Sequence, residues 1–388
     1  MLGGEHGPAV AKSMELLVAL GDVFDAERLV PVESAHISGV SYKNLSDAGL
    51  EFLEEQAELG DKTRIRATLN PAGMDLERWR DLGVPEPFAE KQLKVIRAFE
   101  LMGIEPMCTC TPYLAGHVPK FGSQIAWAES SAVSYSNSVL AARTNRESGP
   151  STLASAVTGR TPLYEYRLDE NRLPVKIVDV EAELRTPKDY SALGYLIGRL
   201  LGSTVPIFRG IVNPDLESLK ALGAASATSG GIALYHIEGV TPEAINLPRS
   251  SLANLERITV EAGDLEEATS RFICDVDDPI ICLGCPHCSL KELRSLSGLL
   301  GSGRLKRRLI AFTSRGVYDE ALRQGYVGAI EKAGGQVFRD TCMVVAPLKE
   351  MGWREISVNS CKAAHYASSM GIAARLGDIE EFVREAMS

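Results

Sequence analysis

Apolar and polar residues follow two alternating patterns along the chain. Short apolar runs that suit buried strands lead into loops rich in Gly, Ser, Thr or Pro, and then into stretches with apolar residues at helical spacing. The strand-like runs are 29–32, 64–69, 205–208, 231–236, 279–283, 308–312 and 343–345. The helix-like stretches are 8–20, 44–59, 90–102, 190–201, 216–222, 265–272, 290–300, 317–333 and 379–387. This alternation predicts an α/β fold with mostly parallel sheets.

One segment departs from this alternation. Residues 164–186 alternate polar and apolar positions around Asp169-Glu170-Asn171, residue types that favour a turn. We therefore expect an inserted β-hairpin near 164–186.

Polar loops follow several of the predicted strands. They are Asn70-Pro71-Ala72-Gly73, Cys108-Thr109-Cys110-Thr111-Pro112, Gly284-Cys285-Pro286-His287-Cys288-Ser289 and Thr313-Ser314-Arg315-Gly316. Ligands of open α/β sheets bind at the carboxyl ends of the strands. Loops that lie far apart in the sequence are therefore expected to meet at one site.

Composition and charge narrow the class of protein. The 388 residues are 45% hydrophobic and 24% charged, which is ordinary for a globular protein and excludes disorder as the main state. A net charge of −10 leaves no electrostatic footprint for nucleic acid or an anionic membrane. The chain lacks the pattern of a signal peptide and any apolar run near ~20 residues. We expect a soluble cytoplasmic protein that binds a small anionic metabolite, without nucleic acid or membrane partners.

The 8 cysteines are the main chemical signal. In a large chain without a secretion signal they are not a disulfide framework. Cys282, Cys285 and Cys288 have a spacing that suits zinc or an iron–sulfur cluster. A path from strand to loop to helix wraps a metal poorly, so we expect Cys285 at the loop apex to be the ligand and Cys282 to fill the core. The sequence leaves Cys288 open between the two roles.

The remaining cysteines are less clear. Cys108 and Cys110 share one side of an extended chain, so the sequence separates them only weakly. Cys342 precedes an apolar run and fits either a third ligand or a core thiol.

Several polar residues have two interpretations. Glu129-Ser130 fits the start of a helix as a cap, or a helix start that presents N–H groups and a carboxylate to a ligand. Lys362 fits a surface lysine or a positive charge for an anionic substrate. No phosphate-binding G-x-x-x-x-G-K-[ST] or G-x-G-x-x-G motif follows a strand, which disfavours a nucleotide enzyme. The histidines near the cysteine loops fit hydrogen-bonding spacers better than ligands: His117, His287 and His365.

Six motifs together resemble the aconitase X family. In chain order they are Ser38-Gly39-Val40-Ser41-Tyr42-Lys43-Asn44, Thr68-Leu69-Asn70-Pro71-Ala72-Gly73, Cys110-Thr111-Pro112-Tyr113, Leu283-Gly284-Cys285-Pro286-His287, Asp340-Thr341-Cys342-Met343 and Asn359-Ser360-x-Lys362-x-Ala364-His365-Tyr366. Each motif alone has modest specificity, but six in order are specific. The likeness covers residues 1–388.

The resemblance implies a single catalytic unit over residues 1–388. Its expected architecture is the large component of the aconitase superfamily, with several layered α/β lobes around a central cleft and without the small swivelling domain. The resemblance also implies a hydro-lyase with an iron–sulfur cluster, expected as [4Fe–4S], on Cys110, Cys285 and Cys342. Substrate contacts in the family match Gly39, Val40, Ser41, Asn70, Pro71, Glu129, Ser130 and Lys362.

The chemistry of the family gives these residues roles. One iron without a protein ligand would act as a Lewis acid on the leaving hydroxyl. Backbone N–H groups of 39–41 and the Asn70 amide suit a carboxylate or phosphate, and Lys362 would add ~1.5–3 kcal/mol through a charge-assisted hydrogen bond. No base is evident in this chain, so we expect a separate small subunit to supply it, in a heterodimer or higher heteromer.

Within the family, the expected reaction is dehydration of (R)-5-phosphomevalonate to trans-anhydromevalonate 5-phosphate in the archaeal mevalonate route to isoprenoids. One alternative is cis-3-hydroxy-L-proline as substrate, against which the missing fused small domain argues. Another alternative is a non-catalytic iron–sulfur or zinc protein built on the 282–288 run, which predicts a closed four-ligand metal site.

Overall fold

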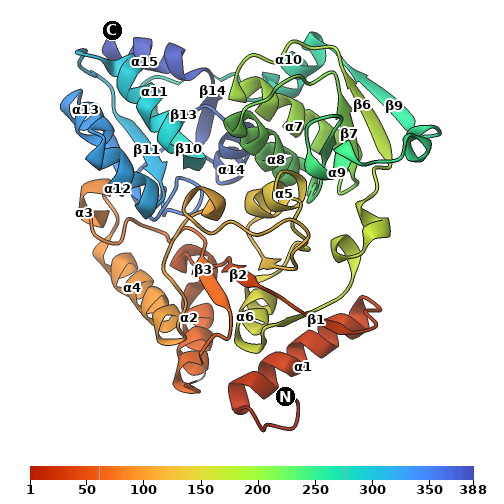
Figure 1. The fold of residues 1–388 in the computed structure, drawn as a ribbon. Coiled ribbons are helices and arrows are strands. Elements are labelled where there is room, and N and C mark those ends of the chain that lie inside the picture. Colours follow the sequence, from red (N-terminus) through yellow and green to blue (C-terminus); the bar gives the residue numbers. More distant parts are fainter. Residues whose placement is uncertain (61, 275) are drawn as a thin grey trace.

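The computed structural model describes residues 1–60, 62–274 and 276–388. The chain forms three lobes, each built around its own sheet (Figure 1). Within the described residues, the single antiparallel strand pair is β1 (Leu29–Pro31) with β5 (Arg160–Pro162), and all other paired strands run parallel. The predicted α/β class with mostly parallel sheets is confirmed.

The first lobe contains the three-stranded sheet β3-β2-β4. Its strands are β2 (Ser34–Ile37), β3 (Arg66–Leu69) and β4 (Ala126–Trp127). Its helices are α1 (Pro8–Val23), α2 (Tyr42–Glu58), α3 (Trp79–Leu82), α4 (Glu86–Leu101), α5 (Ser130–Ser138), α6 (Gly149–Thr158) and the 3₁₀ turn η1 (Pro112–Leu114). The chain passes from β2 to β3 on one side and later returns to β4 on the other. This reversal leaves a crevice at the carboxyl ends of β2 and β4.

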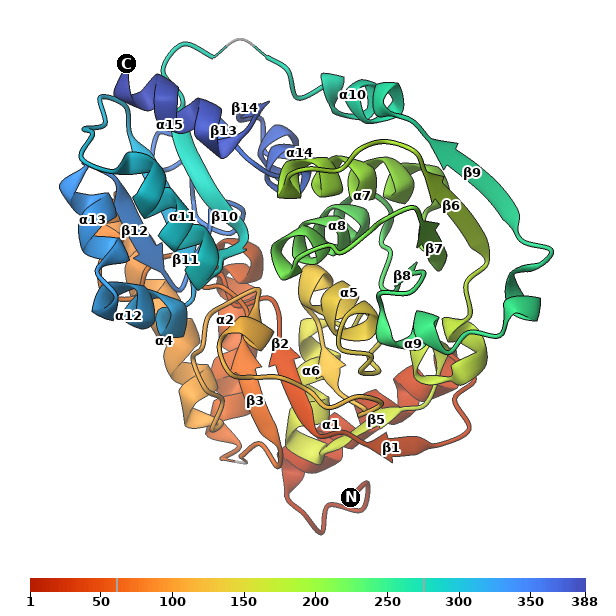
Figure 2. The ribbon, with the colours of Figure 1, turned by 45° about the horizontal axis from the view of Figure 1, so that its top comes forward.

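The second lobe contains the sheet β8-β7-β6-β9. Its strands are β6 (Lys176–Val180), β7 (Pro206–Arg209), β8 (His236–Ile237) and β9 (Glu256–Val260). Its helical elements are α7 (Pro187–Leu201), α8 (Leu216–Gly230), α9 (Pro242–Ile245), α10 (Ala262–Ser270) and the 3₁₀ turn η4 (Arg249–Leu252). Helices α7 and α8 pack side by side and face the rest of the molecule (Figure 2).

The third lobe contains the sheet β12-β11-β10-β13-β14. Its strands are β10 (Ile280–Cys288), β11 (Leu309–Thr313), β12 (Gln336–Arg339), β13 (Glu355–Val358) and β14 (Ala373–Leu376). Its helices are α11 (Leu290–Leu300), α12 (Arg315–Arg323), α13 (Tyr326–Lys332), α14 (Cys361–Ser369) and α15 (Ile379–Met387). Strand order reverses between β10 and β13, which opens a second crevice at their carboxyl ends.

The three lobes share a core. One cluster of buried apolar side chains includes Trp127 of the first lobe, Tyr195 of the second and Phe312 of the third. Helix α8 contacts α5 and α14, so the helices of all three lobes meet near the middle of the molecule (Figure 2). A cavity of about 280 Å³ lies between the second and third lobes. No helix in the described part of the chain has the length and apolarity needed to cross a membrane.

The predicted hairpin near 164–186 is wrong. Its first half forms two 3₁₀ turns, η2 (Glu165–Arg167) and η3 (Asp169–Arg172). Only β6 is extended, and it pairs in parallel with β7 and β9. The segment therefore connects the first lobe to the first strand of the second.

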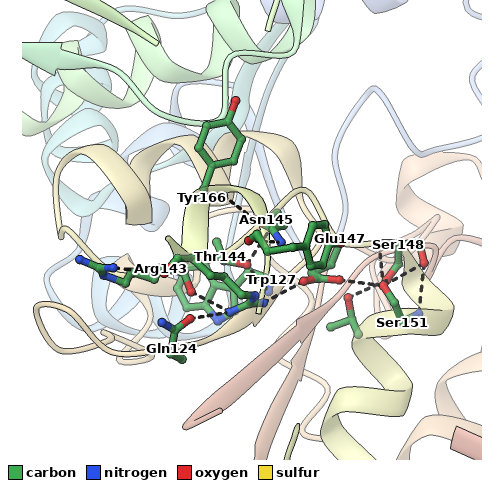
Figure 3. A network of polar contacts seen from close by, with 12 residues as sticks. Gln124, Trp127, Arg143, Thr144, Asn145, Glu147, Ser148, Ser151 and Tyr166 are labelled. Carbon is green, nitrogen blue, oxygen red and sulfur yellow. Dashed lines mark hydrogen bonds and ion pairs between the residues drawn. The ribbon is translucent and has the colours of Figure 1, made fainter. Parts of the chain in front are cut away.

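The physical reason for the difference is a buried arginine in the first turn. Arg167 forms an ion pair with Glu147 at 2.8 Å and donates to Gln124 Oε1 and to the Arg143 carbonyl, each at 3.0 Å (Figure 3). A buried guanidinium is stabilised by acceptors within reach of its donors, and here the two terminal nitrogens of Arg167 have them while Nε has none among the described residues. These three acceptors hold the backbone in a compact turn that a hairpin strand would not allow.

Three other expectations also differ from the structure. The run 231–236 is loop except for its last residue, which begins β8. The stretch 317–333 is not one helix, because Gly325 adopts φ 81° and separates α12 from α13. The run 343–345 is a turn and not a strand. The consequence of that turn for Cys342 is described below.

Candidate active site

The two crevices open onto one region. The loop 39–41 follows β2 and Glu129 follows β4, while Cys285 lies near the end of β10 and Lys362 follows β13. Lys362 Nζ lies 2.6 Å from Glu129 Oε1, which joins the crevice of the first lobe to that of the third. Residues far apart in the sequence meet here because both sheets reverse their strand order at this place.

A break in β10 presents Cys285. The register between β10 and β11 shifts between Leu283 and Cys288. Gly284 has φ 99°, and a Cβ there would lie 2.1 Å from the Phe312 carbonyl oxygen. A glycine is therefore required at the register shift, where β10 runs close to the backbone of β11 just before Cys285.

Three thiols interact at this place. Cys110, Cys285 and Cys342 are each buried. The Cys285 thiol donates toward the Cys342 sulfur, which raises the pKa of Cys285 and lowers that of Cys342. Burial is the main cause of the raised pKa of Cys110, and the charges of Glu129 and Cys342 add to it. Each sulfur therefore influences the ionisation of the others.

Backbone donors surround two of these sulfurs. The turn 343–345 directs the N–H groups of Val344 and Val345 toward the Cys342 sulfur, and both lower its pKa. The His287 N–H donates to Cys110 Sγ at 3.2 Å. Such donors stabilise thiolates, the form in which cysteine binds a metal.

The His287 ring braces the three cysteine loops. Its Nε2 lies 2.8 Å from the Thr341 carbonyl oxygen, and its Nδ1 lies 3.0 Å from Thr109 Oγ1. The carbonyl requires a proton on Nε2, so Nδ1 accepts from the threonine and the ring is neutral. Burial is the main reason that the pKa of His287 falls to about 4. His287 is therefore a hydrogen-bonding spacer between the loops of Cys110, Cys285 and Cys342.

The other cysteines point elsewhere. Cys282 packs in the core shared by the lobes, whereas Cys288 packs in a separate core of the third lobe near the Lys220–Glu292 ion pair. Cys108 lies in the core of the first lobe, and the Cys361 N–H donates to Ser191. Cys282, Cys108 and Cys361 have no charge interaction with Cys110, Cys285 or Cys342 among the causes of their pKa shifts, whereas the charge of Cys110 has a minor effect on Cys288.

The donor set bears on the kind of metal site. Among the described residues, no three His, Cys, Asp or Glu side chains are grouped to hold a single metal ion. Zinc needs its ligands about 2.0–2.3 Å from one point, whereas an iron–sulfur cluster spreads its thiolates over different irons. The zinc alternative, with four ligands around the 282–288 run, finds no support. Three buried, mutually interacting thiols with backbone donors fit a cluster.

Lys362 and Glu129 form a buried ion pair beside the thiols. Glu129 caps α5, where its Oε2 accepts from the Ala132 N–H and from Ser131 Oγ, each at 2.6 Å. Burial would raise the pKa of Glu129, but Lys362 lowers it overall. Burial would lower the pKa of Lys362, but Glu129 and the nearby thiols raise it overall. Glu129, predicted as a helix cap, and Lys362, predicted as a positive charge for a ligand, thus form one ion pair. Lys362 is buried and is not a surface lysine.

Unpaired polar atoms line the predicted substrate loops: backbone donors at 39–41 and a side-chain acceptor at Asn70. Within the described residues, the N–H groups of Gly39, Val40 and Ser41 have no protein acceptor. The Asn70 Oδ1 atom is buried without a hydrogen-bond partner. Groups of this kind are satisfied by water or a ligand, and consecutive N–H groups suit an anion.

Direct hydrogen bonds connect these loops to Cys342. Ser41 Oγ donates to the Val345 carbonyl at 2.8 Å, and the Ala72 N–H donates to the Asp340 carbonyl at 2.8 Å. Pro71 is buried beside Ala72, and Ser130 lies half-buried beside Glu129. The structure thus links the regions of all eight predicted substrate contacts to one another, and their role in binding stays a prediction.

The sequence interpretation missed residues that hold the loops. Lys43 Nζ donates to the carbonyls of Val344 and Ala346, at 3.2 and 3.0 Å. Gln92 in α4 is fully buried and bonds to both substrate loops. A signal for Gln92 was present, because it is a polar residue four positions after Phe88 on the apolar face of α4.

Comparison with known proteins assigns the family. Models of the aconitase X first, second and third domains match residues 1–170, 174–270 and 279–388. The chain belongs to the aconitase X family. The resemblance inferred from the six motifs is thereby confirmed.

Relatives and a solved structure agree with this assignment. The chain is 50% identical to the phosphomevalonate dehydratase large subunit of Methanothermobacter thermautotrophicus, over 99% of this chain and 96% of that protein. It is 36% identical to the cis-3-hydroxy-L-proline dehydratase of Pseudomonas aeruginosa, over 95% of this chain but 65% of that protein. The crystal structure of Thermococcus kodakaraensis aconitase X (holo-form) superposes with a TM-score of 0.93 at 47% identity, covering 99% of this chain and 97% of that one.

Proposed function

We propose that this aconitase X chain is the large subunit of a phosphomevalonate dehydratase. The reaction is loss of water from (R)-5-phosphomevalonate to give trans-anhydromevalonate 5-phosphate. The observation that carries the proposal is similarity over nearly the whole length of large subunits so named, at 43–50% identity in four archaeal species. Similarity to the hydroxyproline dehydratases, at 35–36% identity, spans only 64–65% of those proteins, whereas a further large subunit at 36% identity is covered over 96% of its length. That difference favours the phosphomevalonate reaction over the alternative.

Cys110, Cys285 and Cys342 would hold an iron–sulfur cluster, and [4Fe–4S] is the form we propose. Their burial, their mutual interaction and the N–H groups of His287, Val344 and Val345 support this set. When bound, the cluster supplies a Lewis-acidic iron for the leaving hydroxyl.

The residues of this chain bind and orient the substrate. The free N–H groups of 39–41 donate to an anionic group of the substrate, the Asn70 amide nitrogen adds a donor beside them, and the unpaired Asn70 Oδ1 accepts from a hydroxyl of the substrate. Lys362, held by Glu129, places one positive charge between the thiols and these donors. Because the pair is buried, its field acts on the substrate with little screening by solvent.

The base that removes the proton comes from a small subunit. The relatives are named large subunits, which supports a partner chain. Near the thiols, the titratable groups of this chain are committed to one another: Glu129 to Lys362, and His287 to Thr109 and Thr341. We therefore expect the large chain alone to have no dehydratase activity.

The test uses the two subunits produced together and reconstituted with iron and sulfide under anaerobic conditions. The expected result is water loss from (R)-5-phosphomevalonate, detected by mass spectrometry, with no turnover of cis-3-hydroxy-L-proline. Cys110→Ser, Cys285→Ser and Cys342→Ser should each lose bound iron and activity. Cys282→Ser and Cys288→Ser are matched controls that should retain iron. Turnover of the proline alone, or iron loss only in the control variants, would overturn the proposal.

A further inference from the structure

Gln92 links the two loops to which we assign the substrate's anionic group. Its Oε1 accepts from the Tyr42 N–H and from the Gly73 N–H, each at 2.9 Å. Its Nε2 donates to the Val40 carbonyl, also at 2.9 Å. One side chain from α4 thus fixes backbone groups on both sides of the crevice of the first lobe.

The hydrogen bonds of Gln92 orient the free donors of the loop. The Val40 carbonyl belongs to the same peptide unit as the Ser41 N–H, so holding the carbonyl sets the direction of that N–H. The Tyr42 N–H is taken by Gln92, while the N–H groups of 39–41 have no acceptor within the described residues. Gln92 therefore accepts from the Tyr42 N–H, which serves the structure, while the N–H groups of 39–41 remain available to a ligand.

Close packing holds the two loops at one separation. A Cβ on Gly73 would lie 2.6 Å from Ser41 Oγ and 2.8 Å from Gln92 Oε1, so only glycine allows this approach. Phe88, one helical turn before Gln92, packs edge-on against Tyr42 with ring centroids 5.6 Å apart. One face of α4 thus clamps the start of α2 against the loop 70–73.

We propose that Gln92 is a positioning residue that sets the geometry of the anion-binding loops of this site. The inference rests on the proposed function, because it takes 39–41 and Asn70 as the groups that receive the substrate. Gln92 contacts neither the cysteines nor the Lys362–Glu129 pair in any hydrogen bond described here. Its effect should therefore fall on substrate binding and leave the metal centre unchanged.

Gln92→Met tests this, because methionine keeps the length of the side chain and removes all three hydrogen bonds. In the reconstituted two-subunit enzyme, KM for (R)-5-phosphomevalonate should rise by about tenfold or more. The amounts of bound iron and sulfide should match wild type. So should the temperature at which the absorbance of the metal centre is lost on heating. Gln92→Glu keeps the acceptor for Tyr42 and Gly73 but sets a carboxylate oxygen against the Val40 carbonyl and a negative charge beside the anion-binding loops, so its KM should rise at least as much as that of Gln92→Met.

Gln56→Met is the matched control. Gln56 is a buried glutamine of α2 whose Nε2 has no partner in the described part of the chain, and it is absent from both loops. Its KM should stay within about twofold of wild type. A second readout needs no substrate: amide hydrogen exchange at Tyr42 and Gly73 should speed up in Gln92→Met and not in Gln56→Met.

The outcomes separate this inference from the proposed function. If wild type turns over no phosphomevalonate, the proposed function fails, and exchange at Tyr42 and Gly73 still tests the positioning role. If wild type is active and Gln92→Met keeps its KM within about twofold, the inference is overturned. Loss of iron in step with the rise in KM would also overturn it, because the residue would then act through the metal centre.

Discussion

Two buried glutamate–cation pairs in this chain have different surroundings. Glu147 and Arg167 have side chains exposed by 1% and 0%, and Glu129 and Lys362 by 7% each. Arg167 also bonds to Gln124 and a backbone carbonyl, and Glu147 accepts from Ser151 of α6, so the first pair has structural partners on both sides, although Arg167 Nε has none among the described residues (Figure 3 labels Gln124, Glu147 and Ser151). Burial alone would not tell the two pairs apart.

The second pair lies next to groups that need a ligand. Lys362 bonds to Glu129 and Ser131, which use two of its three N–H donors. Its charge also acts on the thiols of Cys110 and Cys285. A buried ion pair is weak support for stability and weak support for function by itself. The comparison teaches that the neighbours of the pair, more than its burial, indicate which role it has.

The largest effect is expected from breaking the structural pair. Arg167→Met leaves Glu147 buried without its cation, which costs about 3–5 kcal/mol and should lower the apparent melting temperature by about 5–10 °C. The folded fraction should keep wild-type kcat/KM and bound iron. Arg185→Met, in the exposed pair with Glu183, is the control and should change stability by less than about 0.5 kcal/mol. A stable but inactive Arg167→Met would contradict the assignment of this pair to structure.

Lys362→Met should mainly reduce catalysis. Removing one preorganised charged donor is expected to lower kcat/KM about 10²–10³-fold, or about 2.7–4 kcal/mol. The variant also loses stability, because Glu129 becomes an unpaired buried carboxylate. The double variant Glu129→Gln with Lys362→Met should recover stability to within about 1 kcal/mol without recovering activity. Recovery of both would place this pair in the same class as Glu147–Arg167.

The smallest effect concerns pH. The pKa of Glu129 is lowered overall, so its stabilisation is complete above the unfolded value near ~4.3 and is lost as pH falls through the lower folded value. The pKa of Lys362 is raised overall, so its stabilisation is complete below ~10.4 and is lost as pH rises through the higher folded value.

Neither partner should therefore titrate between about pH 5 and 10. In kcat/KM profiles of the two-subunit enzyme, Glu129→Gln should leave each inflection in that range within about 0.3 pH units of wild type. An inflection that moves by a full unit would show that the pair controls a group that titrates during catalysis.

Local patterns predicted much of the fold. The helices 8–20, 290–300 and 379–387 and the strands near 29–32 and 308–312 follow from hydrophobic periodicity, and α1, α11, α15, β1 and β11 confirm them. The hairpin at 164–186 failed because two turns were fixed by long-range partners of Arg167, which no local pattern contains. The strand predicted at 343–345 failed for a local reason: the N–H groups of Val345 and Ala346 donate to the Cys342 carbonyl at 3.2 and 3.1 Å and close a turn.

Some features of the candidate site could likewise be predicted from the sequence, and others only from the structure. Residue types and their order on the chain were enough to group the motifs and to pair Glu129 with the start of a helix. The expected loop 284–289 is wrong, because Cys285 lies within β10, where the register with β11 shifts. The choice of Cys110 over Cys108 rested on the family resemblance, and the structure places Cys108 in a different core. Gln92 left a weak signal as a polar residue on the apolar face of α4, but the roles of Gln92 and of Lys43, which donates to two backbone carbonyls, follow only from their tertiary partners.

The sequence by itself determined the alternation of strands and helices, the caps, and the chemical groups available, because these depend on residues a few positions apart. The tertiary structure decided which loops meet, which buried charges lie beside the three thiols, and which N–H groups have no acceptor among the described residues. Those outcomes depend on where two sheets reverse their strand order and on hydrogen bonds between residues up to hundreds of positions apart, such as Ser41 and Val345. Short-range preferences do not encode such contacts, so only the packed chain fixes them.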